Sequence, residues 1–253
     1  MELRGRVVAV TGAGRGLGRA MAVAFAAKGA SVAAIDLDEP GLAETAGLVT
    51  AAGVRCATYV ANVAKEDDVV RTFDAIVADL GALHGVVNNA GITRDGLLVK
   101  PKDGAITTMS LAQWQAVIDV NLTGVFLCGR EAAKHMIAQK VAAGCIVNIS
   151  SIARYGSHGQ TNYAAAKAGV VALSETWAKE LARYRIRTGT IAPGTMDTEM
   201  IAAMRPDARE RLIAAVPVGR LGDPANIAQA AVFLFENDYM TGRCIDVDGG
   251  LRT

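Results

Sequence analysis

The amino-acid sequence predicts an α/β protein with one doubly wound parallel sheet of about seven strands and helices on both faces. Two observations predict this class. Short apolar runs rich in β-branched residues alternate with longer stretches of helical periodicity along the chain. Several of the short runs are continuously apolar, as expected for strands buried on both faces of a parallel sheet. No linker, low-complexity tract or internal repeat interrupts the alternation, so we expect residues 1–253 to form one domain.

The expected elements follow one another in a regular order. Strands are expected at Val7–Val10, Val32–Ile35, Ala57–Val60, Gly85–Val87, Cys145–Ile149, Thr188–Ile191 and Cys244–Val247. Helices are expected at Leu17–Lys28, Gly41–Ala52, Lys65–Leu80, Ser110–Ala138, Gln160–Tyr184 and Pro224–Phe235.

Two stretches fall outside this alternation. Leu97–Met109 has a Lys-Asp-Gly turn between two apolar arms, which predicts a short hairpin. Thr195–Val216 follows a Pro-Gly break and is rich in Met, Ala and Arg. Because long excursions from a compact sheet are often functional, we interpret it as a helical flap over a cleft, with an ordinary pair of surface helices as the alternative.

Charge and cysteine content exclude several classes of function. The chain carries 26 Lys and Arg against 25 Asp and Glu, without the basic excess of a nucleic-acid-binding protein. One basic cluster, Arg183, Arg185 and Arg187, is interpreted as a solvated helix end or as an anionic docking patch. The four cysteines form no CxxC pair and the three histidines add no ligand spacing, so we expect no metal site and a reducing compartment. We also expect neither a signal peptide nor a membrane span, hence a cytoplasmic protein.

A glycine-rich turn joins the first expected strand to the first expected helix. The segment Thr11–Gly18 fits the pattern T-G-x-x-x-G-x-G, and it matches neither the Walker pattern nor G-x-G-x-x-G. Glycine lets the backbone approach a pyrophosphate, and the following helix offers free N–H groups and a positive dipole end. We therefore predict a Rossmann-type dinucleotide site. Its expected contacts in this loop are Gly12, Arg15, Gly16, Leu17 and Gly18.

Asp36 at the end of the second expected strand predicts which dinucleotide binds. A carboxylate there accepts hydrogen bonds from the adenosine ribose and repels a 2′-phosphate. Arg15 favours the opposite choice, because its guanidinium can pair with that phosphate. Leu37 supplies no second cation. We therefore expect NAD to be preferred over NADP.

Tyr163 and Lys167 are spaced i and i+4 in an expected helix, so both side chains lie on one face. A tyrosine with an ordinary pKa near 10 is a poor acid–base catalyst at neutral pH. A neighbouring ammonium favours the phenolate and is expected to lower the pKa of Tyr163. Tyr-x-x-x-Lys alone is a weak motif, and its meaning depends on the motifs around it.

Six motifs occur in one order along the chain. They are the glycine loop, Asn88–Gly91 after the fourth strand, Asn121 in a helix, Ser150-Ser151 after the fifth strand, Tyr163 with Lys167, and Pro193-Gly194. In this arrangement the chain resembles the short-chain dehydrogenase/reductase family, from about residue 5 to Asp248–Gly250. The resemblance implies an NAD(P)-dependent oxidoreductase acting on a carbonyl or secondary alcohol.

The resemblance also implies roles for individual residues. Tyr163 is the general acid/base, Lys167 binds the nicotinamide ribose, Ser151 binds the substrate oxygen and Asn121 holds a water that relays protons. The Ser151–Tyr163 spacing is one residue shorter than is usual in the family, so Ser150 is an alternative to Ser151. Further cofactor contacts implied by the resemblance are Asn62, Val63, Asn89, Ala90, Gly91, Pro193, Gly194 and Thr198.

The segments Gly91–Asp95 and Gly159–Lys167 are most similar to those of 3-oxoacyl-acyl-carrier-protein reductases. We therefore expect a 3-oxoacyl thioester of acyl-carrier protein or CoA as substrate. Asp36 and the absence of an Arg just before the fifth strand argue against this subfamily. The alternatives are a secondary or cyclic alcohol dehydrogenase and a non-catalytic NAD-sensing protein. The resemblance also implies a homotetramer, and the expected helices Ser110–Ala138 and Gln160–Tyr184, which are apolar over more than one stripe, favour association.

Overall fold

The computed structural model describes residues 1–102, 104–198, 201 and 204–251. A seven-stranded parallel sheet in the order β3-β2-β1-β4-β7-β8-β9 forms its centre. The seven expected strands are all confirmed, with ends that differ by one or two residues. The strands are β1 (Val7–Thr11), β2 (Ser31–Asp36), β3 (Cys56–Val60), β4 (Gly85–Asn88), β7 (Gly144–Ile149), β8 (Ile186–Pro193) and β9 (Arg243–Val247).

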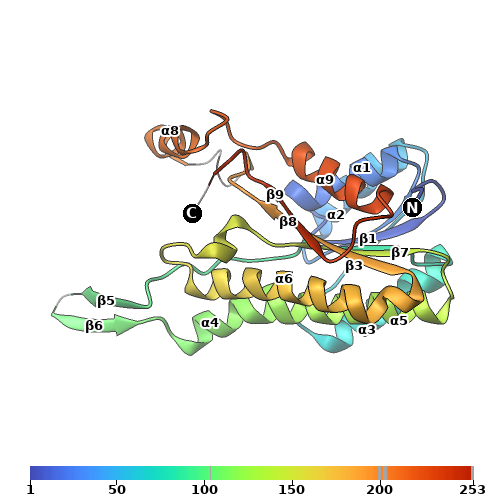
Figure 1. Cartoon of the computed structure of the whole chain (residues 1–253), viewed down its shortest axis with the longest axis horizontal. Coiled ribbons are helices and arrows are strands. Elements are labelled where there is room, and N and C mark those ends of the chain that lie inside the picture. The colour runs from blue at the N-terminus through green and yellow to red at the C-terminus, as the bar shows by residue number, and fades with distance from the viewer. Residues whose placement is uncertain (103, 199–200, 202–203, 252–253) are drawn as a thin grey trace.

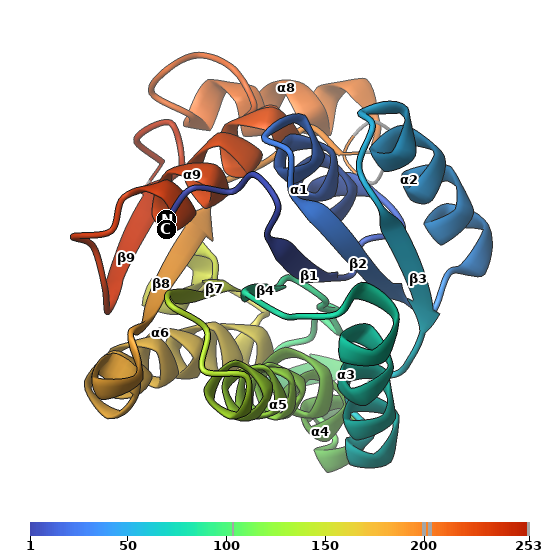
Figure 2. The same cartoon turned by 90° about the vertical axis from the view of Figure 1, so that its right-hand side faces the viewer.

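Helices cover both faces of the sheet, which makes three layers (Figure 2). The order reverses beside β1, where the chain crosses from β3 to β4, so the carboxyl ends of β1 and β4 flank a topological switch point. One face carries α1 (Gly16–Ala27), α2 (Glu39–Ala51) and α9 (Pro224–Glu236). The other carries α3 (Glu66–Leu80), α4 (Leu111–Ile118), α5 (Gly124–Ala138) and α6 (Thr161–Leu181).

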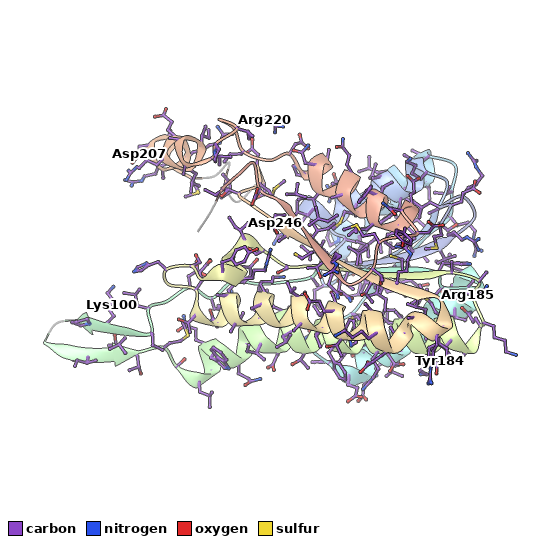
Figure 3. All side chains as sticks on the ribbon, viewed as in Figure 1. Lys100, Tyr184, Arg185, Asp207, Arg220 and Asp246 are labelled. Atoms are coloured by element: carbon purple, nitrogen blue, oxygen red, sulfur yellow. The ribbon has the colours of Figure 1, made fainter. Side chains whose placement is uncertain are left out.

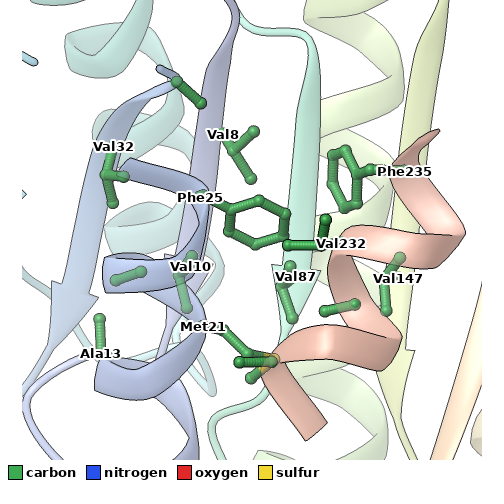
Figure 4. Close-up of a cluster of buried hydrophobic side chains, with 14 of the residues drawn as sticks. Val8, Val10, Ala13, Met21, Phe25, Val32, Val87, Val147, Val232 and Phe235 are labelled. Atoms are coloured by element: carbon green, nitrogen blue, oxygen red, sulfur yellow. The ribbon is translucent and has the colours of Figure 1, made fainter. Parts of the chain in front are cut away.

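Two hydrophobic cores, one on each side of the sheet, fix these layers. On the α1/α9 side, Phe25 and Phe235 meet edge to face with ring centroids 4.8 Å apart, over Val8, Val87 and their neighbours (Figure 4). Aromatic pairs of this geometry add to the stabilisation that comes from buried area. All four cysteines are free thiols.

The expected helix Ser110–Ala138 is the main difference from the sequence prediction. It is divided into α4 and α5 by a π-helical turn, Asp119–Thr123, which contains Asn121. Single π turns inside helices are frequent at functional sites, and no hydrophobic periodicity reveals them. The other long helix also ends early, because Ala182–Tyr184 forms a 3₁₀ turn after Leu181.

The hairpin expected within Leu97–Met109 is confirmed as β5 (Val99–Lys102) paired antiparallel with β6 (Ala105–Thr108). The hairpin projects from one end of the molecule, and α8 (Pro206–Ala215) lies at the same end (Figure 1). No helix among the described residues is both long and apolar enough to cross a membrane.

The basic cluster predicted from the sequence does not lie near the hairpin or α8. Tyr184 and Arg185 are at the end of the molecule opposite Lys100 of the hairpin and Asp207 of α8 (Figure 3). Arg187 is not part of a surface patch, since its guanidinium donates to the carbonyl oxygens of Leu234, Phe235 and Met240 at 2.8–2.9 Å. Of the two interpretations of this cluster, neither describes Arg187, which ties β8 to the end of α9.

Candidate active site

The glycine loop between β1 and α1 is shaped by close backbone contacts. Gly12 has a φ of +66°, and a Cβ on it would lie 2.8 Å from Asn89 Nδ2. A Cβ on Gly18 would collide with the carbonyl oxygen of Gly12. No side chain caps the first turn of α1, which begins at Gly16 beside the N-cap residue Arg15. The loop therefore offers uncapped helix N–H groups, the arrangement that binds phosphates.

A cavity of about 550 Å³ opens beside this loop, at the carboxyl ends of the strands. Most of the residues expected at the adenine and ribose positions line it. They are Gly12, Arg15, Asp36, Leu37, Asn62, Val63, Asn89, Ala90 and Gly91, joined by Ile35, Asp38, Ala61, Ile92 and Val120. We call this space the nucleotide cavity.

Asp36 is at the rim of the nucleotide cavity and also organises the glycine loop. Its Oδ2 accepts a hydrogen bond from the Gly14 N–H at 2.8 Å, and its Oδ1 accepts from the N–H groups of Leu37 and Asp38. Asp38 also lines the cavity, where its Oδ1 caps α2 by accepting from the Gly41 N–H at 3.2 Å, so two acidic residues lie where the adenosine is expected. Arg19 lies nearby, but its guanidinium pairs with Glu44 at 2.6 Å.

Asn89 joins the glycine loop to the strand next to it. Its side-chain Nδ2 donates to the carbonyl oxygens of Thr11 and Gly12, and the Thr11 hydroxyl accepts from the N–H groups of Asn89 and Ala90. Asn62 stabilises a turn within its own segment, since its Oδ1 accepts from the Ala64 N–H at 3.0 Å. These bonds hold the walls of the nucleotide cavity at fixed separation.

A second cavity of about 550 Å³, which we call the catalytic cavity, adjoins the first. Both are lined by Asn89, Gly91 and Ile92, so they form one continuous groove across the end of the sheet. The catalytic cavity brings together the expected residues Leu17, Ser151, Tyr163, Lys167, Pro193, Gly194 and Thr198. Its apolar lining includes Ile152, Met196, Ile201, Leu212 and Leu251.

Tyr163 and Lys167 face this cavity from one side of α6. The Lys167 ammonium lies 5.6 Å from the centroid of the Tyr163 ring and donates to the Ile149 carbonyl oxygen at 2.7 Å. Burial lowers the pKa of Lys167 to about 8. Burial also raises the pKa of Tyr163, the Ser151 hydrogen bond lowers it, and the Asp95 carboxylate raises it further. Lys167 is not among the causes of this shift, so the expectation that its ammonium lowers the pKa of Tyr163 stays a prediction.

The two candidate serines differ in what their hydroxyls contact. Ser151 bonds to Tyr163 and accepts from the Ala153 N–H at 3.1 Å. The Ser150 hydroxyl is buried and donates to the Lys167 carbonyl oxygen at 2.7 Å. Ser151 thus faces the reactive phenol, whereas Ser150 fastens β7 to the backbone of α6.

Asn121 is fully buried in the π turn. Its Oδ1 accepts from the Ile92 N–H at 2.8 Å, and its Nδ2 donates to the Ile92 carbonyl oxygen at 2.9 Å. The side-chain amide therefore fixes the wall that the two cavities share. Both polar atoms of the Asn121 side chain are thus bonded to Ile92, and Asn121 is not among the residues that line either cavity. The expectation that Asn121 holds a water stays a prediction.

Three residues near the cavities were missed by the sequence analysis. Asp38 faces the adenosine end, and its position two residues after Asp36 was an available signal. Asp95 and Gln160 form a hydrogen-bonded pair beside the catalytic cavity, where Gln160 Nε2 lies 3.2 Å from both Asp95 carboxylate oxygens. No local pattern links these two residues, because 65 positions separate them.

The lining fits a nicotinamide dinucleotide. The uncapped turn of α1 lies between an acidic rim for a ribose and a buried lysine next to a tyrosine. The groove that the two cavities form together has room for the two nucleoside halves. Among the described residues, no group of three His, Cys, Asp or Glu side chains is placed to hold a metal ion.

Comparison with known proteins agrees with this fit. A family model described as enoyl-(acyl carrier protein) reductase matches residues 12–252. The chain is 41% identical to the 3-oxoacyl-(acyl-carrier-protein) reductase of Thermotoga maritima, over 99% of both chains. It is 38% identical to the protein of that name from Vibrio harveyi, again over 99% of both. It is also 39% identical to the (3R)-3-hydroxyacyl-CoA dehydrogenase of Canis lupus familiaris, over 99% of this chain and 98% of the other.

Proposed function

Because the chain belongs to the short-chain dehydrogenase/reductase family, we propose that it is an oxidoreductase that reduces the 3-oxo group of an acyl thioester with a nicotinamide cofactor. One observation carries this proposal. Tyr163, Ser151 and Lys167 lie together in a cavity that continues directly into the nucleotide cavity. Relatives named for 3-oxoacyl and 3-hydroxyacyl thioesters align with nearly the whole chain, which supports this substrate class over a simple alcohol.

Each catalytic side chain has a separate task. The bound nicotinamide supplies or accepts the hydride. Tyr163 donates its hydroxyl proton to the carbonyl oxygen as that oxygen gains negative charge. Ser151 donates a second hydrogen bond to the same oxygen, which stabilises the developing alkoxide in a site with little water. Lys167, protonated at neutral pH, binds the nicotinamide ribose and favours the phenolate that remains after proton transfer.

The pKa of Tyr163, raised by burial, leaves the phenol protonated at neutral pH. This is the protonation state that reduction of a ketone requires, although the shift also makes the phenol a weaker acid. Oxidation of an alcohol by the same residue first requires the phenol to lose its proton, which burial opposes. We therefore expect reduction to be favoured at neutral pH and oxidation to improve as the pH rises.

The acyl chain has an apolar place to bind. Met196, Ile201 and Leu212 line the catalytic cavity, and flexible or branched apolar side chains suit an alkyl chain. Of the other methionines in this Met-rich segment, Met204 is 39% exposed and Met200 lies outside the described residues. Arg185 is at the far end of the molecule, so it does not contribute to thioester binding within one chain (Figure 3). Closure of the 195–216 flap over this cavity remains a prediction.

We expect NAD to be the preferred cofactor. Asp36 and Asp38 both line the adenosine end, and together they would repel a 2′-phosphate. Arg15 lines the same cavity as the opposing cation. The two carboxylates support NAD, whereas Arg15 is the residue through which NADP would bind.

A homotetramer and a cytoplasmic location remain predictions. The structure supports association through an apolar groove between α5 and α6, where Phe126 is 42% exposed. Trp177 does not contribute to such a surface, because it is buried against Gly129. Light scattering at micromolar concentration should give four times the mass of the chain, and a monomer would contradict this expectation.

The test of the proposed function is a set of initial rates with NADH and NADPH. The substrates are acetoacetyl-CoA, its truncated pantetheine thioester and cyclohexanone. We expect turnover of both thioesters, with the highest kcat/KM for NADH and acetoacetyl-CoA. Turnover of cyclohexanone without turnover of either thioester would replace the proposal with an alcohol dehydrogenase. Cofactor binding with no turnover at all would indicate a sensor of the cofactor.

A further inference from the structure

A row of buried polar side chains crosses the middle of the sheet beneath α6. Asn88 of β4, Asn148 of β7 and Thr190 of β8 are register partners in neighbouring strands. All three are at most 2% exposed, within a layer that is otherwise mainly apolar. Asn88 Nδ2 donates to Asn148 Oδ1 at 2.7 Å, so the row is a chain of hydrogen bonds rather than three separate groups.

The row ends on one residue of the helix above it. Asn148 Nδ2 donates to the Ser174 hydroxyl oxygen at 2.8 Å, and the Thr190 hydroxyl donates to the same oxygen at 2.7 Å. Thr188, on the same face of β8, donates to the Ser174 carbonyl oxygen at 2.6 Å. Three side chains from two strands therefore converge on Ser174, which is 1% exposed.

Helix geometry connects Ser174 to the catalytic residues. Tyr163, Lys167 and Ser174 are 4 and 7 positions apart in sequence, which at about 100° per residue places all three within roughly 40° on one stripe of α6. Ser174 lies about 10 Å along the helix axis from Lys167. Near Lys167 the helix is held again, through the Ser150 hydroxyl and the Ile149 carbonyl oxygen.

Apolar packing alone would tolerate small shifts of a helix lying on a sheet, whereas hydrogen bonds to the hydroxyl and carbonyl oxygens of one residue do not. A shift of α6 by one residue moves Ser174 by 1.5 Å and rotates it by about 100°, which breaks all three bonds and leaves buried donors unpaired. Satisfied buried polar networks of this kind specify one arrangement of a core.

We propose that Ser174 is a positioning residue, which fixes the axial position and rotation of α6 and so places Tyr163 and Lys167 in the catalytic cavity. The inference rests on the proposed function only for its kinetic consequence. The placement of Lys167 can be measured without turnover.

The test compares two substitutions on the same stripe of α6. Ser174→Ala removes the oxygen on which the row ends, and Val170→Ala removes apolar packing one turn nearer to Tyr163. For Ser174→Ala we expect kcat with acetoacetyl-CoA to fall about tenfold, with KM changed less than twofold, since only the placement of the acid is altered. Val170→Ala, although also destabilising, should keep kcat within about twofold of the parent.

The second readout is the titration of Lys167, followed by NMR with lysine labelled at Cε and assigned by its loss in Lys167→Met. In the parent this lysine should titrate well below the other lysines, near pH 8. In Ser174→Ala its midpoint should rise by at least half a pH unit, because a displaced helix leaves the ammonium less buried, and in Val170→Ala it should not move. If the parent turns over no ketone, the proposed function fails, and this titration still decides the positioning role.

Two results would overturn the inference. One is a Ser174→Ala protein with the kcat and Lys167 midpoint of the parent. The other is a Val170→Ala protein with the same changes as Ser174→Ala, which would make the effect one of general loosening. If Ser174→Ala does not fold, Thr190→Val removes one of the two bonds that the Ser174 hydroxyl oxygen accepts, with little change in volume. It should give the same two changes at about half the size, and their absence counts equally against the inference.

Discussion

The two halves of the groove are built in different ways. The nucleotide cavity depends on a tight backbone turn beside it, with glycines at Gly12 and Gly18 where a Cβ would collide with neighbouring atoms. The catalytic cavity depends on two side chains of one helix, the half-buried Tyr163 and the buried Lys167, and hydrogen bonds to Ser150 and Ile149 hold Lys167 in place. We expect cofactor binding to be lost when the backbone of the first half cannot approach the ligand. We expect turnover to be lost when a single side chain of the second half is altered or displaced.

Gly18→Ala should have the largest effect on the nucleotide half. Its Cβ would collide with the Gly12 carbonyl oxygen, so the loop must open and the helix N–H groups move away from the phosphates. We expect the Kd for NADH, measured by calorimetry, to rise at least about a hundredfold. Gly47→Ala in α2 is the matched control, because a Cβ there meets nothing within 4 Å. Equal affinities in the two variants would contradict this account of the loop.

Lys167→Met tests the catalytic half and separates function from stability. Burial lowers the pKa of Lys167 from 10.5 to about 8, so below pH 8 the folded protein bears a cost of about 3 kcal/mol for a charge that the unfolded chain holds in water. That cost disappears as the pH rises from 8 to 10.5. We expect the variant to lose at least about a hundredfold in kcat and to gain about 1–3 kcal/mol in unfolding free energy at pH 7.

Urea unfolding at pH 7 and at pH 10 measures the second effect. The gain from Lys167→Met should shrink at pH 10, since the parent lysine is then neutral in the folded state. A variant that is less stable than the parent at pH 7 would show that the ammonium stabilises the fold.

Asp36→Ala should have an intermediate effect, confined to the choice of cofactor. We expect kcat/KM to fall about tenfold with NADH and to rise with NADPH, because a ribose acceptor and a repelling charge are both lost. Asp36→Asn is a partial control for the loop, since its single amide oxygen can still accept from the Leu37 and Asp38 N–H groups while the Gly14 N–H loses its acceptor. It should improve NADPH use with a smaller loss for NADH. A parent enzyme that prefers NADPH would instead assign Arg15 to the 2′-phosphate.

The smallest effect is expected from the hairpin. Residues 100–107 can be replaced by an Asn-Gly turn, which shortens β5 and β6 without reaching the residues that line the catalytic cavity. If the hairpin restricts a bulky carrier protein at the mouth, kcat/KM for the acyl-carrier-protein thioester should rise about threefold, with acetoacetyl-CoA unchanged. A fall for the carrier-protein substrate alone would make the hairpin a binding element.

The sequence predicts the sheet and the cofactor loop well because both depend on local patterns. Buried parallel strands are continuous apolar runs, and the tight turn before α1 requires glycine at particular positions. The sequence also predicts that the motif residues lie in one groove, since parallel strands present their carboxyl ends at one edge of the sheet.

What the sequence could not predict depends on distant contacts. The π turn at Asn121 arises beside Ile92, and the pKa of Tyr163 depends on burial by several elements. Arg187 resembles its basic neighbours in sequence, and only the fold turns it towards the end of α9. The polar row beneath Ser174 needs the register of three strands, which no single segment contains.

Tyr163→Phe tests the central claim most directly, because it removes one oxygen atom and keeps the ring that packs on α6. The measurements are kcat for NADH-dependent reduction of acetoacetyl-CoA and the Kd for NADH by calorimetry. We predict that turnover is lost while the Kd stays within about threefold of the parent value, since the proton donor is removed and the nucleotide cavity is not. Retention of more than about a tenth of the parent kcat, a loss of only 1.4 kcal/mol in transition-state stabilisation, would contradict the assignment of Tyr163 as the acid.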